Sequence, residues 1–166
     1  MYTWFLVSMW VHLLTAMIWI GGLSFMSMVL VPALRQPALR PQAALLLRTA
    51  GRKFMRVAYA SLVTLVVTGA ANLYLKGGGS FAAFTADTPY GRVLMTKIAL
   101  VLVVLAVAVY HDFVVGPAAA RAMESDPGGA AAQRLRARAS WLGRVNMLLS
   151  VVIMTLALFL VRGLPA

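Results

Sequence analysis

The sequence contains no cysteine, which excludes disulfides, thiolate metal sites, iron–sulfur clusters and covalently attached c-type haem. It also has little negative charge, because four Asp and Glu residues stand against fifteen Lys and Arg residues. A metal site would therefore have to use histidine, methionine, aspartate, lysine or backbone atoms. No nucleophile elbow, phosphate-binding glycine loop or carboxylate pair is present, and the run Gly77–Ser80 is typical of a flexible loop.

Hydrophobic residues make up 62% of the chain and form four runs, each long enough to cross a bilayer as a helix. The expected helices cover residues 4–31, 54–75, 93–116 and 140–161. We therefore predict an all-α integral membrane protein, with residues 1–166 forming a single four-transmembrane-helix bundle. The first run is too long for a signal peptide and no positive charge precedes it, so we expect a retained helix.

The positive charges gather in the loops after the first and third helices. Short loops rich in Lys and Arg normally stay in the cytoplasm, which predicts that both termini lie outside. The expected location is a bacterial-type inner (cytoplasmic) membrane, crossed several times, with the lipid bilayer as the first partner. Despite a net charge of +11, this distribution is typical of membrane topology and argues against nucleic-acid binding.

Ionisable groups interrupt the third run, with Lys97 near its outer end and His111 and Asp112 near its inner end. Such groups are costly at membrane depth and normally face a protein interior or a water-filled cavity. The helical rise places His12 and His111 at depths that differ by roughly 15 Å. A metal–nitrogen bond is only about 2 Å long, so the two histidines do not readily share one iron within one chain. The predicted outer polar layer contains His12, Asn72, Lys97 and Met154, and the inner layer contains His111, Arg144 and Asn146.

Each candidate also has a purely structural interpretation. His12 is either a ligand to haem iron or copper, or a histidine hydrogen-bonded to a neighbouring helix. Gly21 and Gly22, just below it, allow close helix packing or make room for a flat macrocycle. His111 is either a second metal ligand or proton entry point, or a cap at the end of its helix, with Asp112 paired to a loop arginine or to Arg144.

Two cations at the outer end also have both a structural and a functional interpretation. Lys97 either extends to the outer interface or pairs with a haem propionate, and Arg92 could bind a propionate too. A stripe of small polar residues on the second helix is typical of helix–helix packing, as is the face around Asn146. The stripe consists of Ser61, Thr64, Thr68 and Asn72. Met26 and Met28 diverge by roughly 160° on a helix, which gives weak support for a methionine stripe.

Two stretches resemble a known family. Trp10–Leu34, WVHLLTAMIWIGGLSFMSMVLVPAL, is similar to the first-helix pattern of the copper-resistance protein D family. Tyr90–Phe113 resembles the helix of that family with the pattern glycine–arginine–x–leucine–x–x–lysine, here ending at Lys97. The related HemJ-type protoporphyrinogen oxidases also combine a first-helix histidine with a later helix bearing a lysine and then a histidine.

This resemblance implies a four-helix membrane bundle that binds haem b, with His12 as first ligand and Lys97 as its polar partner. It also implies an association with copper. Full-length copper-resistance proteins of this type have more helices than the four expected here. That difference weakens an assignment to copper import and leaves porphyrin chemistry open.

The leading hypothesis is a membrane b-type haem protein with one or two haems, acting in electron transfer or as a haem-dependent oxidoreductase. His12, with Met154 opposite, would hold an outer haem, and His111 an inner one. The remaining cofactor-binding candidates are Lys97, Arg92 and Asn72 outside, and Arg144 and Asn146 inside.

Two alternatives stay open. A HemJ-type protoporphyrinogen oxidase would need a lipid-facing cleft with cations for two propionates. A copper transport or resistance protein would bind copper at the same histidines. The partners implied by these hypotheses are a quinone, a porphyrin or an electron-transfer protein, together with a second copy of the chain in a homo-oligomer.

Overall fold

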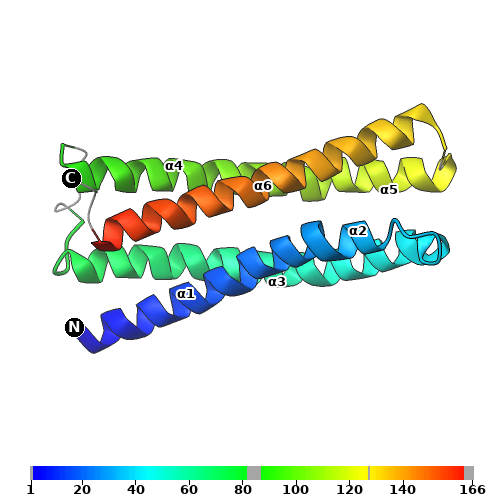
Figure 1. Cartoon of the computed structure of the whole chain (residues 1–166). Helices are drawn as coiled ribbons and strands as arrows, with labels where there is room; N and C mark the ends of the chain where they lie inside the picture. The colour runs from blue at the N-terminus through cyan, green and yellow to red at the C-terminus, as the bar shows by residue number, and fades with distance from the viewer. Residues whose placement is uncertain (1, 82–86, 127, 163–166) are drawn as a thin grey trace.

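A computed structural model describes residues 2–81, 87–126 and 128–162 of the chain (Figure 1). Within these residues it contains four helical segments that are long and apolar enough to span a membrane. They are Tyr2–Ala33, Ala43–Lys76, Pro89–Ser125 and Ala130–Arg162. The described part of the chain contains helices and no strand, so the prediction of an all-α protein with four helices long and apolar enough to span a membrane is confirmed.

The first and third segments each contain a wide π-helical turn near the same end of the bundle. The first consists of α1 (Tyr2–Ser24), η1 (Phe25–Leu30) and α2 (Val31–Ala33). The third consists of α4 (Pro89–Tyr110), η4 (His111–Val115) and α5 (Gly116–Ser125). Each wide turn is followed by a proline, Pro32 or Pro117, which has no backbone N–H and whose ring crowds the preceding turn. A locally wider helix accommodates that ring without ending the segment.

The second and fourth segments are continuous helices, α3 (Ala43–Lys76) and α6 (Ala130–Arg162). Both begin about ten residues before the starts expected at residues 54 and 140. Their first turns are rich in alanine, leucine and arginine, which are strong helix formers, and no proline interrupts them. Helix α4 also begins earlier than expected, because Thr88 caps it: its side-chain oxygen accepts a hydrogen bond of 2.9 Å from the Gly91 N–H.

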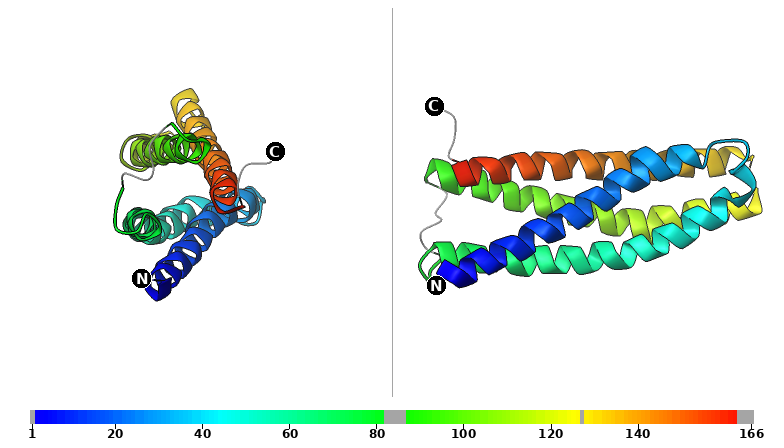
Figure 2. Two further views of the ribbon diagram at one scale, coloured as in Figure 1. Left: turned by 90° about the vertical axis from the view of Figure 1, so that its left-hand side faces the viewer. Right: turned by 60° about the horizontal axis from the view of Figure 1, so that its bottom comes forward.

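The four segments pack as two hairpins, α1 with α3 and α4 with α6 (Figure 1). The hairpins meet mainly where α1 lies against α6, whereas α3 and α4 make almost no close backbone contact within the described residues. The end-on view in Figure 2 shows the two hairpins side by side. Their shared core is small and consists of Trp19, Ala58, Leu62 and Val104. Most other large apolar side chains are exposed, as expected for a bundle whose surroundings are lipid.

The start of α1 and the end of α6 lie at one end of the bundle (Figure 1). The opposite end carries the loop between α2 and α3 and the junction between α5 and α6. These two connections and the helix ends beside them hold most of the arginines. The bundle therefore has a strongly basic end, defined by Arg35–Arg56 and Arg121–Arg144, and a second end that contains both chain termini.

Candidate functional site

His12 lies between α1 and α3 and is fixed there by a threonine. Its Nδ1 atom is 2.7 Å from the Thr68 hydroxyl oxygen. That hydroxyl donates its own proton to the Thr64 carbonyl oxygen at 2.6 Å. Because a hydroxyl has one proton to give, a Thr68 that donates to Thr64 accepts from His12, and this arrangement assigns the proton of the neutral imidazole to Nδ1. The lone pair of Nε2 remains available, which is how protein histidines are prepared to bind a metal.

The contact between His12 and α3 agrees with the prediction of a histidine hydrogen-bonded to a neighbouring helix, and it is compatible with a role as ligand. Thr68 was expected only as part of a packing stripe. The signal for its role was the spacing of Thr64, Thr68 and Asn72 at four-residue intervals, which places three polar side chains on one face of α3. Sequence spacing alone could not show that this face meets His12.

Lys97 of α4 belongs to the same outer layer. Its side chain is half-buried, and its positive charge acts electrostatically on the His12 imidazole. Asn72 lies one helical turn beyond Thr68, and its Oδ1 atom is buried without a hydrogen-bond partner in the described part of the chain. Buried polar atoms without partners are rare in proteins, so Asn72 is available to a water or a ligand.

Two other residues predicted to bind a cofactor at the outer end lie on the surface. Arg92 is exposed at the start of α4, and Met154 of α6 is 54% exposed. The prediction that Met154 acts as a ligand opposite His12 gains no support from that position.

The space beside Gly22 is occupied, because a Cβ atom added there would overlap the Phe54 ring. Gly22 therefore serves close packing of α1 on α3, and makes no room there for a macrocycle.

The inner layer is built around His111 and Asp112. The His111 Nδ1 atom lies 2.8 Å from the Asp112 carboxylate, and both side chains are partly buried. The expected pairing of Asp112 with Arg144 is not seen, because Arg144 is exposed and His111 takes the carboxylate. The alternative of His111 as a cap is also wrong, since the helical segment continues through η4 into α5 and ends at Ser125.

Further polar groups surround this pair. The Tyr59 hydroxyl is buried beside Asp112, which acts on it electrostatically, but it makes no hydrogen bond of good geometry. The Tyr59 ring packs against Phe113 with 6.1 Å between ring centroids. Asn146 of α6 is buried, and its Oδ1 atom has no partner among the described residues.

Neither histidine belongs to a preformed metal site. Within residues 2–81, 87–126 and 128–162, no group of three or more His, Asp or Glu side chains gathers to hold a metal ion. The Met147 thioether at the inner end lies 3.2 Å from the Ser27 hydroxyl, which makes its shorter hydrogen bond, of 2.8 Å, to the Leu23 carbonyl oxygen. Each histidine therefore offers one imidazole nitrogen to a metal ion. The other ligands of such an ion would have to come from groups outside these clusters.

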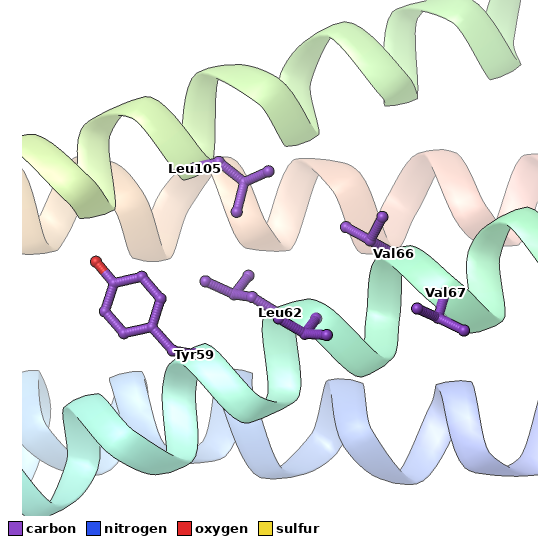
Figure 3. A pocket seen from close by; sticks show the side chains of 6 residues that line it. Tyr59, Leu62, Val66, Val67 and Leu105 are labelled. Atoms are coloured by element: carbon purple, nitrogen blue, oxygen red, sulfur yellow. The ribbon is translucent and has the colours of Figure 1, made fainter.

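An apolar groove lies between α3 and α4, where the two hairpins are least tightly joined (Figure 3). Its volume is about 270 Å³, and its lining consists of Tyr59, Leu62, Val63, Val66, Val67 and Leu105. None of these six side chains is a cation. The lining itself therefore offers no positive charge to a propionate.

Comparisons with known proteins cover most of the chain. The family model described as copper resistance protein D matches residues 48–160, which include α4, α5 and most of α3 and α6. His12 and α1 lie outside the matched region. An uncharacterized protein of Aquifex aeolicus (strain VF5) is 29% identical over 150 residues, which cover 89% of each chain. No solved structure matches the chain significantly. Since the family match spans more than half of the sequence and agrees with the predicted resemblance, the protein belongs to the copper resistance protein D family.

Proposed function

We propose that this protein handles copper in a bacterial-type inner membrane, with His12 as the first ligand of the ion inside the bilayer. The observation that carries the proposal is the hydrogen bond from His12 to Thr68, which leaves Nε2 free to bind a metal. Imidazole nitrogen suits copper, and soft thioether sulfur selects Cu(I). The family match, whose printed description refers to copper resistance, supports the same cargo.

A copper ion bound to His12 would have no other protein ligand already in place. This favours a site that binds copper transiently over one that stores it. A single imidazole without a ring of other ligands binds an ion weakly enough to release it, as transport or transfer requires. Met9 lies one helical turn before His12 on α1 and is half-buried, so it is the nearest thioether in the helical register. We propose that copper enters at His12 and is passed on, with water, Met9 or a second chain completing its coordination.

The proposed orientation follows from charge. The basic end of the bundle would lie in the cytoplasm and both termini outside, with residues 1–166 acting as one membrane domain. His12 and Lys97 would then lie in the outer half of the membrane, and His111 and Asp112 in the inner half. Copper arriving from outside would meet His12 first.

The test is copper binding by the purified full-length protein in detergent, with Cu(I) supplied under reducing conditions. We expect about one copper per chain, strongly reduced in His12→Ala and retained in His111→Ala. Elemental analysis and competition with a Cu(I) chelator measure the binding. Unchanged binding by the His12→Ala variant would refute the proposed site.

A second candidate, a haem b protein, is favoured by the position of Lys97. A positive charge within electrostatic range of His12 disfavours a bound Cu(I) ion, but it suits a ligand that carries carboxylates, such as haem through its propionates. His12 would bind the iron, Lys97 and Arg92 would meet the propionates, and His111 with Arg144 would hold a second haem. Bound haem would supply one-electron chemistry, for electron transfer or an oxidoreductase reaction with a quinone or porphyrin.

Optical absorption distinguishes the two candidates. A haem protein expressed with ample haem shows an intense Soret band and a pyridine haemochrome, whereas a copper-handling protein shows neither. Lys97→Met gives a second criterion, because it should weaken haem retention but strengthen Cu(I) binding, on the order of tenfold in either case. Lys97→Arg keeps the charge and serves as the control.

A further inference from the structure

The groove between α3 and α4 opens toward the surroundings of the bundle. Val63, Val66 and Val67 line it and are 63%, 52% and 61% exposed. Figure 3 shows Val66 of α3 pointing toward the gap below α4, with Tyr59 at one end of the gap and Leu105 on the α4 side. At membrane depth such a groove is in contact with apolar groups and not with water. Its volume of about 270 Å³ lies below the roughly 300–1,000 Å³ of pockets that enclose whole drug-sized ligands.

The same face of α3 becomes basic at the inner end of the groove. Arg56 and Arg52 precede Val63 by seven and eleven residues, so all three side chains lie within about 20° of one direction round the helix. Arg56 precedes Lys76 by twenty residues, which corresponds to roughly 30 Å of helix and matches the thickness of the bilayer hydrocarbon. The two arginines are therefore at the depth of the lipid phosphates of one leaflet.

Both arginines are exposed, and within the described residues neither makes an ion pair or a side-chain hydrogen bond. The acidic groups at this end are engaged elsewhere or lie farther out. Glu124 pairs with Arg48 at 3.2 Å, and Asp112 pairs with His111. The positive charge at the inner end of the groove is thus available to an external anion.

From this juxtaposition we infer a binding site for an anionic phospholipid. One acyl chain lies in the groove along Val63, Val66 and Leu105, and the phosphate is bound by Arg56 and Arg52. Charge complementarity selects an anionic headgroup, because each arginine near the membrane surface favours anionic lipid over zwitterionic lipid. The site uses none of the residues proposed to bind copper or haem.

The test is native mass spectrometry of the full-length protein in detergent, with phosphatidylglycerol or phosphatidylcholine of equal chain length added. We expect phosphatidylglycerol to bind about tenfold or more tightly than phosphatidylcholine, and this preference to disappear in the double variant Arg52→Gln/Arg56→Gln. The matched control Arg134→Gln/Arg136→Gln removes two exposed arginines from α6 at the same end of the bundle. It should keep the preference.

A second variant tests the acyl-chain half of the site. Val63→Trp fills the groove at an exposed position, so the fold is expected to survive, and it should weaken phosphatidylglycerol binding severalfold. Arg52→Lys/Arg56→Lys keeps the charge and should retain most of the binding. Equal binding of the two lipids by the natural sequence, an equal loss in the α6 control, or unchanged binding by Val63→Trp would each overturn the inference.

Discussion

At the scale of single residues, the hydrogen-bond partner of His12 tells more about its role than its depth in the membrane does. A histidine in a membrane interior can serve packing or metal binding, and the two roles differ in which nitrogen is left free. Thr68 occupies Nδ1 because its own proton is committed to the Thr64 carbonyl oxygen. The hydrogen bond both orients the ring and leaves Nε2 as the nitrogen that can bind a metal.

Thr68→Val is therefore expected to weaken metal binding without removing the ligand. Loss of an orienting partner of a metal-bound histidine typically costs about 10- to 100-fold in affinity. Competition with a Cu(I) chelator measures this change, or retention of haem if the protein is isolated with haem. Thr64→Val is the matched control, because in the described part of the chain the Thr64 hydroxyl bonds only to the Ala60 carbonyl of its own helix, at 2.9 Å. Equal affinities of the two variants would show that Thr68 has no positioning role.

At the scale of helices, close contact between α1 and α3 determines how His12 of α1 lies against Thr68 of α3. Gly22 of α1 leaves no space for a side chain, because the Phe54 ring of α3 lies directly against it. Gly21, the next residue along, has nothing within 4 Å of the corresponding position. One glycine is thus required by packing between helices and its neighbour is not.

This contrast predicts opposite effects of the same substitution. Gly22→Ala should destabilise the protein by about 1–3 kcal/mol, since overpacking pushes α1 away from α3. Gly21→Ala should be neutral or stabilising by up to about 1 kcal/mol, because alanine favours the helix. Thermal unfolding in detergent, followed by circular dichroism, compares the two variants with the natural sequence. Similar shifts in both variants would mean that the contact with Phe54 does not limit packing.

At the scale of the whole molecule, the distribution of charge sets the expected orientation. The basic end of the bundle holds the connections between α2 and α3 and between α5 and α6, and the other end holds both termini (Figure 1). The positive-inside rule places the basic end in the cytoplasm. Because the chain has no cysteine, single cysteines introduced at either end can be labelled without background.

We expect a thiol reagent that cannot cross membranes to label Ser80→Cys in intact cells, and to label Gln36→Cys only after permeabilisation. Ser80 follows α3 at the end with the termini, and Gln36 is exposed in the basic connection. Mass shift on a denaturing gel reports the labelling. The reverse pattern would place the termini in the cytoplasm and His12 in the inner half of the membrane.

Much of the architecture could be predicted from the sequence, because the deciding forces act locally. Long apolar runs specify helices with the length and composition to span a bilayer, and the loop arginines predict a direction that labelling can test. The rise per residue also assigned His12 and Lys97 to one layer and His111 and Asp112 to another. Residues 42–49 were expected to form a separate short surface helix, but α3 runs without a break from Ala43, and α6 likewise begins at Ala130, because residues 43–53 and 130–139 are helical outside the apolar runs.

The sequence by itself therefore determined four helices long and apolar enough to span a membrane, and the position of each polar side chain along its helix, since composition and helical rise depend on the chain alone. Only the tertiary structure decided that His12 meets Thr68, that Asp112 pairs with His111 instead of Arg144, and that Phe54 fills the space beside Gly22. Those pairings depend on how each helix is rotated and tilted against its neighbours. That rotation is set by side-chain packing between helices, which no periodicity within one helix specifies.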